Sequence, residues 1–235
     1  MIKKFQNKIK YLSGMTLIEL MVVIAIFTMI TTITIFDYGS FNSGAAINNL
    51  GDDVALSIRK AQSYAIGTHQ SSGEFDVGYG VHFTTSPAKD MGNYNKLAGS
   101  NKSFILYTDF SSGSTGYKFP LSSSQSTTCG QATHQNECME MLNIGGNSEI
   151  KSISIDKGNG KMTPISEEGA LNIVFKRPNP DALFCYTEKN KSEEKCLFTP
   201  NSISRANIII SNGQDGAKEK TKTISIYNTG QIDIN

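Results

Sequence analysis

One carboxylate stands inside a long apolar stretch near the start of the chain. Glu19 lies close to the beginning of an apolar run from Thr16 to Phe36, and the other polar residues in this run are threonines. Placing a charged side chain deep in a membrane costs at least about 2.5 kcal/mol, so such a residue is by default functional. The pattern predicts that Glu19 pairs with a positive charge. An ordinary membrane anchor that tolerates a glutamate is the alternative.

The four cysteines form two close pairs in polar, loop-like sequence, Cys129 with Cys138 and Cys185 with Cys196. Four cysteines allow three connectivities, and local pairing is favoured because each bond would close a hairpin-sized loop. A bond closing a loop of ~15 residues stabilises a protein by about 3 kcal/mol in the chain-entropy model. The spacings differ from the short C-x₂₋₄-C pairs of zinc modules. We therefore expect disulfides and no metal site.

Candidate catalytic residues are few. The three histidines, His69, His82 and His134, stand in unrelated contexts, and no nucleophile-elbow, zinc-protease or phosphate-loop motif is present. The adjacent acids Glu167–Glu168 and Glu193–Glu194 are expected to be solvated loop residues. The segment 156–160 looks superficially like a calcium loop but lacks the downstream glutamate, and a turn is expected there. The sequence predicts a protein that is not an enzyme and needs no cofactor.

The apolar run is long enough to cross a bilayer, because about 20 helical residues rising ~1.5 Å each span the hydrocarbon core. Residues 1–14 before it contain four lysines and no acid, a flank that keeps this end in the cytoplasm. Residues 37–41 after the run are a poor signal-peptidase site, so the run should stay in the mature protein. Without the leader, 18 basic residues stand against 21 acidic ones, which argues against nucleic-acid binding by net charge.

A second helical pattern follows the run. Its apolar residues recur at three- and four-residue steps and so share one helix face: Ile47, Leu50, Val54, Ile58, Ala61 and Ala65. This amphipathic half of the helix, residues 37–66, is expected to pack on a globular head. Glycines at 39, 44 and 51 cost roughly 1 kcal/mol each in a helix. They predict a kink or local melting near residues 37–46.

Residues 67–235 are predicted to form one β-rich head, because short β-branched runs alternate with polar, glycine-rich connections. Strands are expected at 77–83, 104–108, 150–155, 171–175, 208–210 and 223–227. The Asn212–Gly213 dipeptide predicts a hairpin with a long basic turn between the last two strands. The fold class is α+β, a long N-terminal helix packed on a mostly antiparallel sheet.

The N-terminal residues resemble the signature of a known family. The sequence from Gly14 to Glu19, with its basic leader and apolar continuation, is similar to the prepilin motif of type IV pilins and type II secretion pseudopilins. The resemblance implies a cut between Gly14 and Met15 by a prepilin peptidase and N-methylation of Met15. It also implies that Glu19 offsets the new amino terminus of a neighbouring subunit. A looser similarity over 50–66, 79–83 and 227–232 points to GspH/FimT-like minor pseudopilins and a pilin-like fold.

Such a cut would leave a charged amine at the head of a helix that packs among apolar helices. A buried unpaired charge is costly, and an opposite charge relieves that cost. Glu19 lies four residues after Met15 and therefore on the same helix face. The carboxylate can pair with its own amine or with one from another subunit, and the sequence leaves both possibilities open.

The predicted function is a structural, minor-type subunit of a type IV pilus or a type II secretion-like pseudopilus. Its precursor would cross the cytoplasmic membrane once, head outside, before entering a filament. The partners would be the prepilin peptidase, other pilin or pseudopilin subunits and the inner membrane. The alternative is a membrane-anchored binding or adhesive module whose loops at 84–103 and 121–149 recognise a secreted substrate, a surface or DNA.

Overall fold

The computed structural model describes residues 14–67, 69–73, 75, 77–86, 100–110, 129–130, 137–165, 169–187, 195–196 and 203–235. The leader up to residue 13 and most of the two predicted recognition loops lie outside the described residues. The chain divides into two compact units, Met1–Asn42 and Ser43–Asn235, and each is considered by itself. The second unit joins residues 43–66 of the helix to the β-strands, and the β-rich part of this unit, from residue 67 onward, is called the head below.

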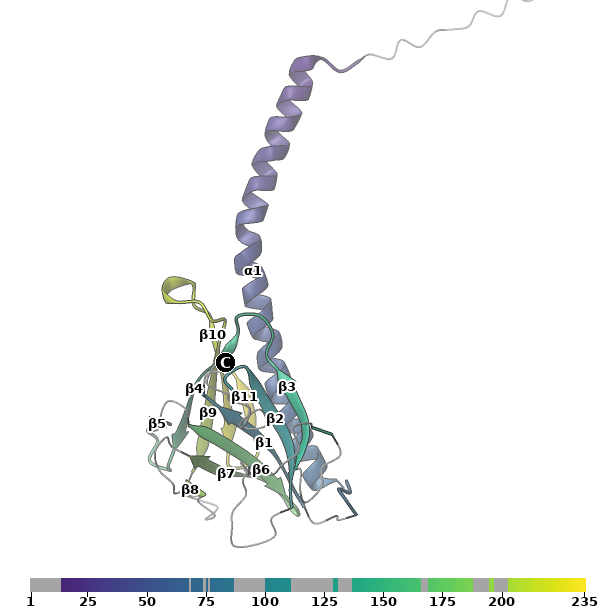
Figure 1. Ribbon diagram of the computed structural model, residues 1–235. Coiled ribbons are helices and arrows are strands. Elements are labelled where there is room, and N and C mark those ends of the chain that lie inside the picture. The colour runs from purple at the N-terminus through teal and green to yellow at the C-terminus, as the bar shows by residue number, and fades with distance from the viewer. Residues whose placement is uncertain are drawn as a thin grey trace, which may run out of the picture. The chain divides into compact units, whose positions relative to one another are not determined.

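One helix, α1 (Leu17–Ile66), runs through both units (Figure 1). The backbone stays helical across residues 37–46, so the local melting expected from the glycines is wrong. Packing explains part of this outcome. A Cβ on Gly44 would lie 3.0 Å from Lys220 Nζ, and one on Gly51 would lie 3.0 Å from Lys222 Cδ. These glycines leave room for lysine side chains of the head, and such contacts override helix propensity.

The predicted inward stripe of the helix is confirmed. Val54, Ile58 and Ala61 are 0% exposed, whereas Asp52 and Asp53 on the opposite side are exposed. The stripe joins one hydrophobic core with residues from both sheets. Burial of apolar surface, which stabilises by about 25 cal/mol per Å², holds this half of the helix on the head.

Two antiparallel sheets make up the head (Figure 1). The six-stranded sheet has the order β3-β2-β1-β6-β7-β8 and the five-stranded sheet the order β11-β10-β9-β4-β5. The strands of the first are β1 (Gly78–Thr84), β2 (Ser103–Asp109), β3 (Cys138–Asn143), β6 (Ala170–Lys176), β7 (Asn179–Thr187) and β8 (Lys195–Cys196). Those of the second are β4 (Glu149–Asp156), β5 (Met162–Pro164), β9 (Arg205–Ser211), β10 (Thr221–Tyr227) and β11 (Ile232–Ile234).

All six predicted strands are present, as β1, β2, β4, β6, β9 and β10, and the predicted α+β fold is confirmed. The expected hairpin joins β9 and β10 through a turn that holds a short 3₁₀ helix, η3 (Gly216–Lys218). In β4 the isoleucines at 150, 153 and 155 face the core, and a register shift between Ile150 and Ser152 keeps all three inward. The alternation therefore holds from Ile153 to Ile155, and the register shift interrupts it so that Ile150 also faces the core.

The six-stranded sheet is buried on both faces. Val81 and Phe83 of β1 belong to the main core, and a second, smaller apolar cluster occupies the other face around Ile105, Tyr107 and Val174. Gly80 permits a close approach there, because a Cβ at this position would lie 2.8 Å from the Tyr107 ring. The Tyr107 side chain therefore lies flat across its neighbouring strand.

Candidate functional site

The residues expected at the cleavage site precede the helix. Gly14, Met15 and Thr16 are non-helical and exposed, with Met15 66% exposed, and α1 begins at Leu17. A Cβ on Gly14 would meet no atom within 4 Å. The peptide bond between Gly14 and Met15 thus lies in irregular backbone, open to an approaching protein. This is the backbone form a peptidase requires, since a helical bond is hidden in its own hydrogen-bond ladder.

Glu19 makes reciprocal hydrogen bonds with Thr16 at the helix start. The Thr16 backbone N–H and its hydroxyl each donate to Glu19 Oε2, both at 2.9 Å. The Glu19 N–H donates in return to Thr16 Oγ1 at 3.3 Å. This is a capping box, in which two backbone donors that no helical carbonyl can serve are satisfied reciprocally. The box places the carboxylate at the positive end of the helix dipole, which also stabilises a negative charge.

Thr16 is the residue that reasoning from the apolar run missed. It precedes the helix, and its hydroxyl binds the Glu19 carboxylate instead of a helix carbonyl. The signal was present in the sequence as Thr-Leu-Ile-Glu, the spacing of a capping box followed by apolar residues.

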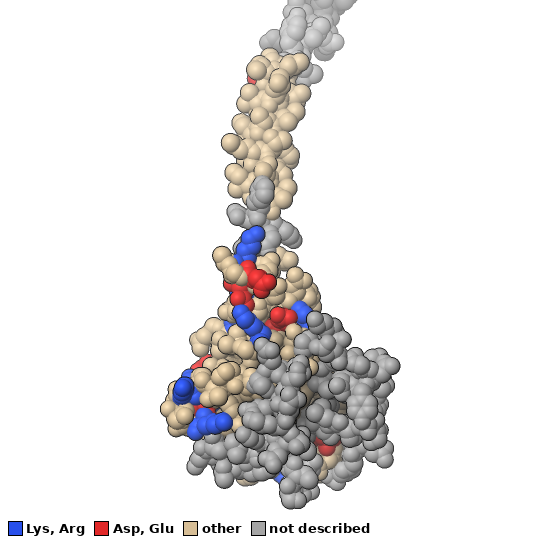
Figure 2. Space-filling model, turned by 60° about the vertical axis from the view of Figure 1, so that its left-hand side comes forward, with Lys and Arg blue, Asp and Glu red and all other residues tan. Residues whose placement is uncertain are grey.

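The apolar helix beyond the box is suited to a bilayer or to other helices. Residues Leu17–Ile35 have a mean hydropathy of 2.3, and none of this stretch is buried within the chain. The threonine hydroxyls within the helix donate to carbonyls of the same helix. Thr31 Oγ1 donates to the Phe27 carbonyl at 2.7 Å, and Thr28, Thr32 and Thr34 make equivalent bonds. In Figure 2 this part of the helix is almost uniformly without charge.

A shallow hollow runs along the start of this helix, lined by Gly14, Met15, Ile18, Glu19 and Val22 among others. Glu19 is the acid of this hollow, and Met15 lies at its edge. Met15 and Glu19 both line the hollow, so a positive group that enters it can reach the carboxylate. The arrangement can hold a cation beside an apolar surface.

One of the two predicted disulfides is present. Cys129 and Cys138 are bonded, with their Cα atoms 4.9 Å apart, and they join the segment before β3 to the first residue of that strand. Cys185 is also disulfide-bonded, and its register partner across β7 and β8 is Cys196. The Cys196 side chain lies outside the described residues, so the pairing of Cys185 with Cys196 remains a prediction.

The two described histidines, His69 and His82, stand in separate settings. His82 is buried in β1, with Nδ1 2.8 Å from Asn172 Oδ1, while the His69 ring stacks on Tyr64 at 4.3 Å between centroids. His134 and both predicted acid pairs, Glu167–Glu168 and Glu193–Glu194, lie outside the described residues. Asp156 caps the turn that follows β4 by accepting the N–H groups of Asn159 and Gly160. Among described residues no three metal-ligating side chains cluster.

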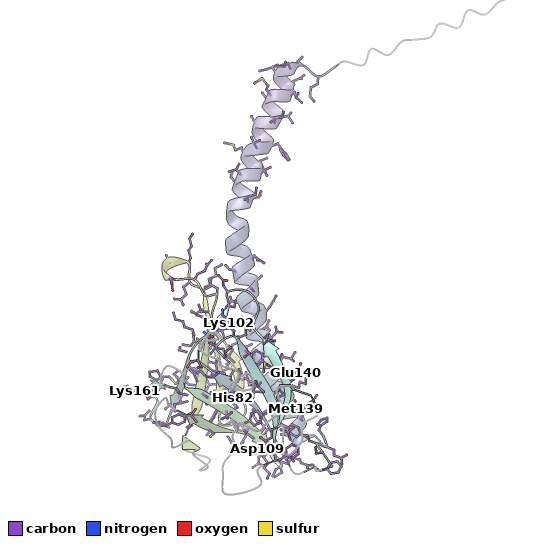
Figure 3. All side chains as sticks on the ribbon, in the orientation of Figure 1. His82, Lys102, Asp109, Met139, Glu140 and Lys161 are labelled. Atoms are coloured by element: carbon purple, nitrogen blue, oxygen red, sulfur yellow. A yellow bond between two sulfur atoms is a disulfide. The ribbon has the colours of Figure 1, made fainter. Side chains whose placement is uncertain are left out.

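Two buried carboxylates were not anticipated. Asp109 at the end of β2 (labelled in Figure 3) and Glu137 just before β3 are 3% and 5% exposed. Burial, and then the nearby Asp109 charge, raise the pKa of Glu137 to about 8, although the Phe110 N–H donates to Glu137 Oε1 at 3.3 Å. Single polar residues at strand ends carry no periodic signal, so their burial could not be predicted from the sequence.

Comparison with known proteins finds a match to the N-terminal part of the chain. Residues 10–35 match the prokaryotic N-terminal methylation motif. No curated protein and no solved structure matches the chain. The match covers the last five residues of the leader, the expected cleavage site, the capping box and the apolar helix. It supports a type IV pilin-like protein in this segment, and the helix that follows is long and apolar enough to cross a membrane.

Proposed function

We propose that the protein is a subunit of a type IV pilus or of a pseudopilus of the type II secretion kind. A prepilin peptidase removes residues 1–14, Met15 is methylated, and α1 then carries the subunit from the cytoplasmic membrane into a filament. Before that step the head lies outside the cytoplasm. The chain acts through assembly and performs no catalysis of its own.

The observation that carries this proposal is that the Glu19 carboxylate is hydrogen-bonded to Thr16 at the start of an exposed apolar helix. None of Leu17–Ile35 is buried in the chain, so its surface must be covered by lipid or by other helices. The capping box satisfies the Glu19 charge before assembly. The new Met15 amine then supplies a cation near Glu19, which can pair with the carboxylate of its own chain or with that of a neighbouring subunit.

Two finer predictions remain. A minor rather than a bulk role is favoured by the looser sequence similarity over 50–66, 79–83 and 227–232. Recognition of a ligand by the loops at 84–103 and 121–149 concerns segments largely outside the described residues. A subunit that assembles leaves the membrane fraction with sheared filaments, whereas an anchored receptor stays with membranes.

The test is the N-terminal sequence and mass of the exported form. The mature chain should begin at Met15 and carry one methyl group. Replacing Gly14 with leucine should leave the full-length precursor, because the peptidase must accommodate this residue while the fold need not. The matched control is Gly145→Ala, since a Cβ there also meets no atom within 4 Å. The control should be processed normally. A mature chain that begins elsewhere, or an uncut chain that still assembles, would overturn the proposal.

A further inference from the structure

The turn that joins β4 to β5 contains an exposed Asn-Gly dipeptide. Residues 157–161 of this turn are exposed, and Lys161, labelled in Figure 3, lies at the margin of the head. Gly160 follows Asn159 with φ +74°, and a Cβ on Gly160 would meet no atom within 4 Å. A glycine leaves its own backbone nitrogen unshielded, because it has no side chain to hinder an approach. The Gly160 nitrogen is therefore open to reaction with the side chain of Asn159.

Two hydrogen bonds prepare this dipeptide for reaction. The Gly160 N–H donates to Asp156 Oδ1 at 3.0 Å, a distance at which a carboxylate can act as a general base. The Lys161 N–H donates to Asn159 Oδ1, also at 3.0 Å, and so polarises the side-chain carbonyl. A donor at this oxygen stabilises the negative charge that develops when a nucleophile adds to Cγ. The turn thus places a base at the nucleophile and an N–H donor at the electrophile.

The other Asn-Gly dipeptide of the chain, Asn212–Gly213, stands in the opposite setting. Asn212 is 3% exposed, its Nδ2 donates to the Lys218 carbonyl at 3.1 Å, and its Oδ1 accepts the Lys220 N–H at 3.0 Å. The Gly213 N–H donates to the Ser211 hydroxyl at 3.1 Å, a neutral group where the first dipeptide has a carboxylate. Burial limits the access of water, and the Lys218 carbonyl holds the amide nitrogen of Asn212 in place. The chain therefore contains one activated dipeptide and one protected dipeptide.

We propose that Asn159 is a site of spontaneous deamidation, with Asp156 as the general base. The Gly160 nitrogen attacks Cγ of Asn159 and passes its proton to Asp156, which forms a cyclic succinimide. The Cγ–Nδ2 bond then breaks, and the nitrogen leaves as ammonia with the proton returned by Asp156. Solvent water opens the ring at either carbonyl and gives aspartate or isoaspartate. The lysines at 157 and 161 then share the turn with two acids instead of one, so this exposed surface loses positive charge. The modification is independent of the proposed function.

The test follows both dipeptides in the full chain in detergent, once folded and once unfolded in guanidinium at the same neutral pH. Water labelled with a heavy oxygen isotope marks each residue that is hydrolysed during the incubation, and peptide mapping by mass spectrometry gives the rate at each asparagine. In the folded chain Asn159 should convert about a hundredfold faster than Asn212, and unfolding should bring the two rates close together. Equal rates in the folded chain would overturn the proposal.

Asp156→Asn separates the role of base from that of hydrogen-bond acceptor. The amide oxygen still accepts the Gly160 N–H but cannot take its proton, so Asn159 should convert about tenfold more slowly. The matched control, Asp53→Asn, makes the same charge change at an exposed position of α1 and should leave the rate unchanged. A wild-type rate in Asp156→Asn would overturn the assignment of the base. The comparison of folded and unfolded wild type needs no substitution, and it decides the proposal if this variant does not fold.

Discussion

The two halves of α1 contain the same kinds of apolar residue in opposite settings. Ile24 in the first half is 53% exposed, whereas Ile58 in the second half is 0% exposed. The second half is stabilised by the two sheets of its own chain, and the first half has no such partner within the chain. An apolar helix face therefore identifies something to be covered, and only the fold shows whether the cover comes from inside or outside the molecule.

The largest expected effect tests the uncovered half. Glu19→Ala should leave processing intact but reduce incorporation into filaments by roughly a hundredfold or more, because losing one partner of a buried ion pair costs about 3–5 kcal/mol. Quantitative immunoblotting of sheared filaments and of the processed chain would measure both. Thr16→Val keeps the carboxylate but removes its hydroxyl partner, and a loss of about 1 kcal/mol or less than tenfold is expected. Normal incorporation of Glu19→Ala would remove the charge-pairing argument.

The next largest effect is expected in the second half of α1, which packs against the sheets. Ile58→Ala should lower the free energy of unfolding by about 2–5 kcal/mol, because it deletes a fully buried side chain from the main core. Leu56→Ala, two residues away and 66% exposed, should change it by less than about 0.5 kcal/mol. Denaturant titration of the full chain in detergent would compare them. Equal effects would mean that the head does not hold this half of the helix as described.

The stability of the head should depend on pH, because the buried Glu137 lies there. The pKa of Glu137 is raised to about 8 from its ordinary 4.5. Between these values the folded head binds a proton that the unfolded chain has lost, so stability falls as the pH rises through this window. Glu137→Gln should remove this part of the fall, and its advantage over wild type in thermal melting should grow from pH 5 to pH 8. A constant difference across that range would argue against a buried, protonated Glu137.

The smallest effect concerns a surface contact between helix and sheet. Lys60 Nζ lies 2.6 Å from Glu140 Oε2 on β3, but the two side chains are 39% and 47% exposed. A double-mutant cycle of Lys60→Gln and Glu140→Gln should give a coupling of about 0.2–1 kcal/mol. A coupling comparable with the loss in Ile58→Ala would mean that charge, and not apolar burial, joins α1 to the head.

Periodic residues made the main elements predictable. The inward stripe of α1 and the six β-branched strands have a repeat that identifies both the element and its buried face. The missed strands lack it. β3 has the sequence CMEMLN, without a β-branched residue; β7 begins with Asn-Pro-Asp; β5 and β11 have three residues each. Pairing with neighbouring strands, which no local pattern records, makes these segments extended.

Some residues of the candidate site could likewise be predicted from local sequence, whereas contacts between distant segments could not. The cleavage residues and Glu19 follow from a short contiguous motif, and the match over residues 10–35 supports that interpretation. The glycines at 44 and 51 were misjudged because helix propensity is local, while the lysines that pack against them come from residues 220 and 222. The burial of Glu137 likewise depends on segments distant in sequence.

The disulfide between Cys129 and Cys138 indicates the compartment in which the head completes its folding. Such bonds form and persist in oxidising compartments and are kept reduced in the cytoplasm. The outer strand of the six-stranded sheet, β3, starts at Cys138 and forms hydrogen bonds only with β2 within that sheet. If the head crosses the membrane as proposed, the bond that joins β3 to the preceding segment forms only after translocation, and the tertiary structure is completed on the far side.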